Sequence, residues 1–359
     1  MPPVDRILRR ACALGVTTLL VAACGGSGGK KAAPTTTGST TPGSTPSAAP
    51  ITAAKPPTAP LTGLPQPDSV KRSRPALAIK IDNVDPARPQ AGLAAADVVY
   101  EELVESRLTR LIALFQSTDA DRIGPVRSTR TTDIDIVSAL NHPLYAYSGG
   151  NTGFVAQLRA APVSDVGADA RGGAYFTSGP HAQPHNLYTT TAALFGLDTS
   201  GTHPPPPLFD YRAAGQAPSG AGVAPASHID MSFGMAAAAW DWDAASATWK
   251  RTQNGSPDID QAGQQLAANN VIVQVINYTI DGYATGEGVV PAPPIPKGQS
   301  VGSGSATILT GGTVIRATWS KASPTAVTQF ADSAGQPIAL APGRTWVELL
   351  PPGPAPNMH

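Results

Sequence analysis

Charge, cysteine and long apolar runs are all scarce in this sequence, and each scarcity excludes a class of protein. Only 14% of the 359 residues are charged, and 25 basic residues balance 25 acidic ones. The chain therefore lacks the basic surface that nucleic-acid binding requires, and we expect no nucleic-acid partner. The only early apolar run, residues 11–23, is too short to cross a bilayer comfortably.

That run follows three arginines and has the pattern of a secretory signal peptide over residues 1–23. It ends in LVAACG, which resembles the bacterial lipobox, so we expect cleavage before Cys24 and acylation of its sulfur. A plain signal peptide with a chance cysteine is the alternative. Cys12 would leave with the leader, so the mature chain could form no internal disulfide. The pattern predicts a lipid-anchored protein on the extracytoplasmic face of the cell membrane.

Residues 24–60 are almost entirely Gly, Ser, Thr, Pro and Ala after the cysteine. Such a segment has too little apolar surface to offset the entropy lost on ordering, so we expect a disordered tether. O-glycosylation at its Thr and Ser clusters is a further hypothesis that composition alone leaves open.

The remainder is rich in turn formers. The chain has 36 glycines and 37 prolines, about a fifth of all residues, which argues against a long helical bundle. Composition shifts then predict an N-terminal domain over 61–205, a linker over 206–224, a smaller C-terminal domain over 225–352, and a disordered tail over 353–359.

Strand and helix patterns alternate in the first domain. Residues 97–105 and 108–116 read as a hairpin across Ser106-Arg107, although the first run also suits a helix. The other expected elements are strands at 76–81 and 144–148, helices at 128–140 and 152–160, and a last element at 187–197. This alternation predicts a layered α/β domain, with a sheet covered by helices.

The second domain reads as mostly antiparallel β structure. Strands are expected at 228–233, 237–241, 247–251, 271–278, 305–310, 313–319 and 345–349. Gly311-Gly312 supplies the turn of one hairpin.

Several separated motifs occur in order: IDN, RPQAGL, ADVVYEELVE, IGPVRSTR and PHNLYT. Together they resemble the YerB-like family of bacterial lipoproteins, a domain-of-unknown-function family. The resemblance covers about 61–352 and implies an N-terminal domain followed by a smaller C-terminal one, without implying an established activity. Ser106-Arg107 departs from the small glycine-like residues typical of that turn in the family.

Acids and arginines concentrate between residues 79 and 130, and this is where we expect a site. Arginine forks bind phosphate or carboxylate, whereas carboxylates hold cations or accept protons. The alternative is a set of structural ion pairs. The candidates are Asp82, Arg88, Asp97, Glu101, Glu105, Arg110, Arg127 and Arg130.

His185 and Asn186 extend the candidate set from a proline-bounded loop. His181 and His185 could ligate a metal only with further ligands. Neither Ser128 nor Ser148 lies in a nucleophile elbow, and the catalytic residues stay unassigned. The Gly149-Gly150 turn before a helix could present N–H groups to an anion, but an ordinary turn explains it as well.

The hypothesis that fits these patterns is a membrane-anchored lipoprotein whose first domain binds an anionic cell-envelope component. Whether it is an enzyme stays open. One alternative is an enzyme acting on cell-wall polymer or a lipid-phosphate precursor, with Asp82 or Asp97 on a metal. The other is a scaffold for envelope or division proteins. No cofactor is predicted, and a divalent cation is left open.

Overall fold

The computed structural model describes residues 56–199, 203–283 and 293–359. The signal peptide, Cys24 and most of the expected tether lie outside the described residues. Residues 57–60, which we assigned to the tether, belong to the folded part, because Ala59 is buried and Thr58 pairs with Pro65. In the described part of the chain, no helix combines the length and hydropathy needed to span a bilayer.

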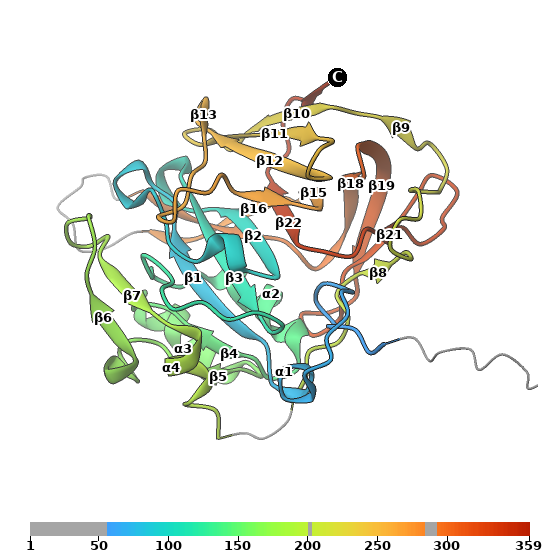
Figure 1. The fold of residues 1–359 in the computed structure, drawn as a ribbon. Coiled ribbons are helices and arrows are strands. Elements are labelled where there is room, and N and C mark those ends of the chain that lie inside the picture. The colour runs from blue at the N-terminus through green and yellow to red at the C-terminus, as the bar shows by residue number, and fades with distance from the viewer. Residues whose placement is uncertain (1–55, 200–202, 284–292) are drawn as a thin grey trace, which may run out of the picture. The chain divides into compact units, whose positions relative to one another are not determined.

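A mixed sheet of eleven strands organises the described residues (Figure 1). Its order is β20 (Gln329–Ala331), β19 (Thr313–Lys321), β18 (Gly302–Thr310), β15 (Asn270–Val275), β22 (Thr345–Leu350), β2 (Val98–Leu103), β3 (Thr109–Phe115), β1 (Leu77–Asp82), β4 (Leu144–Ala146) and β5 (Ser164–Asp165), with β9 (Ala224–Pro225) beside β19.

A second sheet has the order β13 (Ser256–Pro257), β12 (Thr248–Gln253), β11 (Ala237–Asp243), β10 (His228–Ser232) and β23 (Asn357–Met358), with β14 (Ala267–Ala268) beside β12. Three two-stranded pairs complete the β structure: β6 (Tyr175–Thr177) with β7 (Leu187–Thr189), β8 (Asp210–Tyr211) with β21 (Ala339–Leu340), and β16 (Tyr278–Tyr283) with β17 (Pro294–Gly298).

Helices are short. They are α1 (Ser69–Ser73), α2 (Thr131–Val137), α3 (Thr152–Ala160) and α4 (Thr191–Phe195), with 3-10 turns η1 (Asp85–Ala87), η2 (Leu93–Ala95), η3 (Glu105–Arg107), η4 (Ser138–Leu140) and η5 (Gly172–Ala174). Asp133 explains where α2 begins, because its carboxylate accepts the backbone N–H of Arg130 at 2.7 Å. The predicted helices at 128–140 and 152–160 are confirmed by α2, η4 and α3.

Side chains alternate across the central sheet and build two apolar cores. On one face, Ala78 and Ile112 pack with Val137 of α2 and Leu158 of α3. On the other face, residues such as Ile79 belong to the same core as Trp240 and Trp249 of the second sheet. The strands β1, β2 and β3 are therefore covered on both sides, which explains why all six residues of β1 are buried.

The predicted hairpin is confirmed, since β2 and β3 pair antiparallel from Val98↔Leu114 to Leu103↔Thr109. The sequence patterns did not indicate that the two predicted domains share a sheet. Strand β22 pairs parallel with both β15 and β2, so strands of the two predicted domains form one sheet. No local pattern encodes this pairing, because its partners lie far apart in sequence.

The end of the chain also differs from the expected disordered tail. Residues Asn357 and Met358 form β23 and pair with Asp230 and Ile229 of β10. The carbonyl of His359 accepts the backbone N–H groups of Ser227 and His228 at 2.8 and 2.9 Å. These hydrogen bonds order the end of the chain, although its composition predicts disorder.

Candidate functional site

Several segments meet at the carboxyl end of β1, where Asp82 lies in register with Arg110 of β3. The segment after Gly124 runs beside this end of β1: Asp82 N–H donates to Pro125 O, and Arg127 N–H donates to Lys80 O, both at 2.9 Å. These backbone bonds place the Arg127 side chain next to the Asp82 carboxylate. We call the group formed here the arginine site; it comprises Asp82, Glu105, Arg110, Arg127, Arg130 and His185.

Glu105 joins two of the arginines in this site. Arg130 Nε donates to Glu105 Oε2 at 2.8 Å and its Nη2 bonds the other oxygen, while Arg110 Nη2 lies 3.4 Å from Oε1. Burial raises the pKa of Glu105, but the bonds from Arg130 and the charge of Arg110 outweigh that effect and hold the pKa at about 2. Glu105 is therefore a firmly ionised partner.

Arg110 is less well compensated. Burial and the neighbouring charge of Arg130 lower its pKa to about 10. The site contains three guanidinium groups and two carboxylates, so positive charge is in excess before His185 is considered. A buried arginine whose pKa is lowered in this way is stabilised by any additional anion that approaches it.

Arg127 is the most exposed arginine of the site, with 21% of its side chain accessible. Its Nε lies 3.0 Å from Asp82 Oδ2, an ion pair in which the N–H does not point at the oxygen. Within the described residues, neither Nη atom of Arg127 has a hydrogen-bond partner. Its fork therefore keeps donors available for a ligand.

His185 reaches the same carboxylate from the loop between β6 and β7. Its Nδ1 lies 2.8 Å from Asp82 Oδ2, and its side chain is 17% accessible. The backbone N–H of Val126 donates to Leu187 O at 2.7 Å, which fastens this loop beside the Arg127 segment. The other carboxylate oxygen, Asp82 Oδ1, is buried without a partner.

The structure does not bring Arg88 and Glu101 into this site. Glu101 faces the second sheet and accepts a bond from Arg251, which also bonds Asp258. Arg88 Nη2 donates to Asp258 Oδ1 at 2.9 Å. These four side chains form a buried ion network between the predicted domains.

Glu348 of β22 lies opposite Glu101 in this network. Burial raises the pKa of Glu348 well above its usual range, and the nearby Glu101 carboxylate adds to the effect. Trp240 Nε1 donates to Glu348 Oε1 at 2.9 Å, and the Arg251 guanidinium lies 4.7 Å from the Trp346 ring centroid. The burial of Glu101, Arg251, Asp258 and Glu348 indicates a structural role for this network.

Asp97 lies at the opposite end of the β2–β3 hairpin from Arg110. Its Oδ2 accepts the backbone N–H groups of Gln116 and Ser117 at 2.6 and 2.7 Å, so it closes the sheet end instead of sharing a site with Asp82. Asn186 is half-buried next to His185, and its carbonyl accepts Ser178 N–H at 3.0 Å.

A buried triad beneath the site was missed by our sequence reasoning. Lys80 bonds Glu102 and lies 2.6 Å from Asp133 Oδ1, and all three side chains are fully buried. Burial and the charge of Asp133 raise the pKa of Glu102 to about 8. The one signal in the sequence was a lysine inside the apolar run LAIKI.

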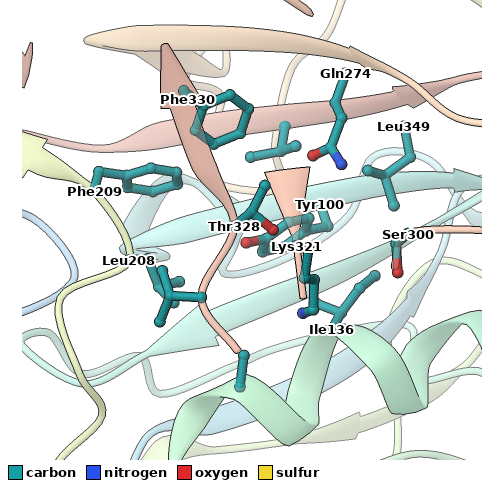
Figure 2. Close-up of a pocket in the computed structure, with 13 residues that line it drawn as sticks. Tyr100, Ile136, Leu208, Phe209, Gln274, Ser300, Lys321, Thr328, Phe330 and Leu349 are labelled. Atoms are coloured by element: carbon teal, nitrogen blue, oxygen red, sulfur yellow. The ribbon is translucent and has the colours of Figure 1, made fainter. Parts of the chain in front are cut away.

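Two hollows elsewhere in the described residues suit an oxyanion less well than the arginine site does. Figure 2 shows the first, where Lys321, Ser300, Gln274 and Thr328 meet Phe209 and Phe330. Its volume is about 20 Å³, which matches a single water molecule. The second, about 640 Å³, lies between β10, β11 and residues 350–357, and its lining includes just two charged side chains, Arg107 and Asp230.

Other candidates take structural roles. Ser128 Oγ donates to Ser148 O and Ser148 Oγ donates to Val126 O, both at 3.1 Å. His181 Nε2 lies 3.1 Å from Pro89 O, outside the arginine site. Among residues 56–199, 203–283 and 293–359, no three His, Cys, Asp or Glu side chains are arranged to hold a metal ion.

Two family models match most of the folded chain. "Protein of unknown function (DUF3048) N-terminal domain" matches residues 61–202, and the C-terminal domain of the same name matches residues 229–347. The chain belongs to this family. The DUF3048 models cover both sides of the shared sheet, including every residue of the arginine site.

A relative, "Putative lipoprotein YerB" of Bacillus subtilis (strain 168), is 35% identical over 133 residues. This match covers 37% of our chain and 40% of the relative, so it spans less than half the relative's length. The crystal structure of YerB from Bacillus subtilis superimposes with a TM-score of 0.71 at 21% identity, covering 84% of our chain and 99% of that chain. This likeness shows the fold.

The backbone at Ser106-Arg107 adopts a conformation that favours glycine. Both residues have positive φ, 59° and 57°, in the turn that carries Glu105 into the arginine site. Glycine adopts this region without a Cβ clash, whereas serine and arginine do so at a cost of about 1 kcal/mol each.

Proposed function

We propose that this chain is a lipid-anchored protein of the extracytoplasmic membrane face that binds an anionic cell-envelope component at the arginine site. The ligand group is a phosphate or a carboxylate, because planar guanidinium forks match such oxyanions. The observation that carries the proposal is the pair of unpartnered Nη atoms on the accessible Arg127, beside the poorly compensated cation of Arg110.

Charge and burial favour an anion over a neutral or cationic ligand. The arginines exceed the carboxylates, and both Glu105 oxygens are already bonded by Arg130. An entering oxyanion would therefore meet donors and a net positive potential. Phosphates occur in lipid-linked and polymeric envelope components, and carboxylates occur in peptidoglycan stems, so both remain candidate sources.

The sequence around Cys24 supports the lipid anchor. The LVAACG sequence at Cys24 fits acylation of that cysteine, and a relative carries a lipoprotein name. Each buried CH₂ of an acyl chain contributes roughly 0.8 kcal/mol to membrane binding, so two or more chains give stable anchoring.

Binding is tested on the purified mature protein in detergent by calorimetry and thermal shift. The probes are inorganic phosphate, a polyprenyl phosphate and a muropeptide, which separate the two oxyanion classes. A ligand at 100 times its Kd stabilises the folded state by about 2.7 kcal/mol. Arg127→Ala should weaken binding roughly 10- to 100-fold, since charge-assisted hydrogen bonds contribute about 1.5–3 kcal/mol.

Arg316→Ala is the matched control, because Arg316 is an exposed arginine on β19, outside the site. It should leave affinity unchanged. Absence of stabilisation by all three probes in folded protein would contradict the proposal and favour the scaffold hypothesis. Equal loss in both arginine variants would show nonspecific charge attraction instead of a site.

A further inference from the structure

A histidine and an aspartate form a hydrogen-bonded pair inside the arginine site. His185 Nδ1 lies 2.8 Å from Oδ2 of Asp82, whose side chain is 1% accessible. A carboxylate accepts hydrogen bonds and donates none, so this contact fixes the imidazole proton on Nδ1. The neutral ring then carries its lone pair on Nε2.

Nε2 is left available at this position. Within the described residues it has no hydrogen-bond partner, and the His185 side chain is 17% accessible. Asp82 Oδ2 also lies 3.0 Å from Arg127 Nε, so the histidine and the exposed arginine share one oxygen. The potential proton acceptor and the anion-binding fork are therefore immediate neighbours.

We propose that the arginine site hydrolyses phosphodiesters, with His185 as the catalytic base and Asp82 as its positioning residue. This inference rests on the proposed function, because the same arginines hold the substrate. It goes beyond binding by assigning a reaction and by choosing phosphate over carboxylate.

The step balances without a cofactor. A water oxygen forms a bond to phosphorus while His185 Nε2 takes a proton from that water. One bond between phosphorus and an ester oxygen breaks, and the imidazolium returns its proton to the departing alkoxide. The products are one alcohol and one phosphomonoester, and the histidine ends in its starting state.

The arginines suit the charge that develops during this step. Attack by water adds negative charge to the phosphoryl oxygens, where Arg127 Nη donors and the Arg110 cation would stabilise it. Asp82 would hold the imidazole in its orientation and stabilise the imidazolium. A phosphodiester needs such help, because its attacking water has to be deprotonated.

A purely structural explanation is that the His185–Asp82 bond braces the loop between β6 and β7. His185→Asn distinguishes the two explanations, because the asparagine amide can still donate to Asp82 but cannot act as a base. His181→Asn is the matched control, since His181 belongs to the same loop and bonds Pro89 O instead of the site.

The test measures hydrolysis of bis(4-nitrophenyl) phosphate by the mature protein in EDTA, with 4-nitrophenyl phosphate as the monoester arm and calorimetry of inorganic phosphate alongside. We expect diester turnover by the unchanged chain and by His181→Asn. His185→Asn should lower kcat at least 100-fold with KM and phosphate affinity within about threefold. Asp82→Asn should lower kcat at least tenfold while KM holds.

Phosphate binding without diester turnover would overturn this inference and leave the proposed function standing. Turnover that survives His185→Asn, or turnover confined to the monoester, would also overturn it. Loss of both phosphate binding and turnover in folded protein would overturn the inference together with the proposed function.

Discussion

Glu101 and Glu102 are neighbours in sequence and lie on opposite faces of β2. Glu101 meets Arg251 under the second sheet, whereas Glu102 meets Lys80 beneath α2. Strand alternation alone separates them, because consecutive side chains point to opposite faces. The two residues consequently serve different networks and should respond differently to substitution.

Loss of charge at Glu102 should be tolerated, but loss of charge at Asp133 should not. Burial and Asp133 raise the pKa of Glu102 to about 8, so the folded state holds it protonated at neutral pH, and Glu102→Gln imitates that form. Asp133→Asn instead removes the ionised partner of the buried Lys80 ammonium and leaves only Glu102, whose charged form burial disfavours, so it should cost about 3 kcal/mol. Urea unfolding at pH 6 measures the free energy of unfolding of both variants.

The pH dependence of this pair follows from the direction of the shift. A carboxyl whose pKa is raised on folding stabilises fully below its unfolded value near 4.5, and that contribution is lost as pH rises through about 8. Between pH 6 and 8, the free energy of unfolding of the unchanged protein should therefore fall by about 2 kcal/mol relative to that of Glu102→Gln. Equal losses in both variants at every pH would contradict this assignment.

At the scale of elements, the turn η3 connects the arginine site to the second sheet. Glu105 lies in the arginine site, where it pairs with Arg130. Arg107 packs over Gly234 in the turn between β10 and β11. In the same turn, Met235 N–H donates to Arg107 O at 3.0 Å. Gly234 has φ +116°, and a Cβ there would collide with the Arg107 guanidinium.

Gly234→Ala should therefore destabilise more than its backbone strain alone explains. Gly255→Ala is the control, because Gly255 is also exposed with positive φ (+76°) but has no neighbouring atom within 4 Å of an added Cβ. We expect about 1 kcal/mol for the control and about 1–3 kcal/mol more for Gly234→Ala, measured by denaturant unfolding. Similar losses would mean that Arg107 moves aside freely.

Local elements were predictable because their signals are local. The β2–β3 hairpin followed from two strand-like runs around a short polar turn, and α2 lies within the helix expected at 128–140. The density of acids and arginines also marked the region of the arginine site. The partner of each charge was not predictable, because it depends on strand parity and on register: Asp82 faces Arg110, whereas Asp97 lies at the other end.

Pairings between segments far apart in the chain could not be predicted from the sequence, for a different reason. The sequence of β22, TWVELL, is typical of a buried strand, and it does not indicate that β2 is the parallel neighbour. The same holds for the Glu101–Arg251 pair, whose members lie 150 positions apart. Such contacts arise from the packing of the whole chain.

At the scale of the whole molecule, the shared sheet predicts one cooperative unfolding transition for both family domains. Strand β22 lies between β2 and β15, and the buried network of Glu101, Arg251 and Glu348 spans the same boundary. Scanning calorimetry of the mature protein should therefore give equal calorimetric and van't Hoff enthalpies.

A chain cut after residue 224 should lose this transition, because β2 loses its parallel neighbour and Glu101 loses its cation. Circular dichroism during heating measures the outcome. Two resolved transitions in the uncut protein, or a native-like transition in the shortened chain, would show that the halves fold independently.

The position of β22 also has a consequence for biosynthesis. A ribosome completes β2 roughly 240 residues before it completes β22, so the nascent hairpin waits with one unpaired edge through most of translation. The central sheet can therefore be completed only after β22 has emerged, near the end of synthesis. Such a delay would suit the export proposed for this chain, because a translocation channel passes chains that have not yet folded.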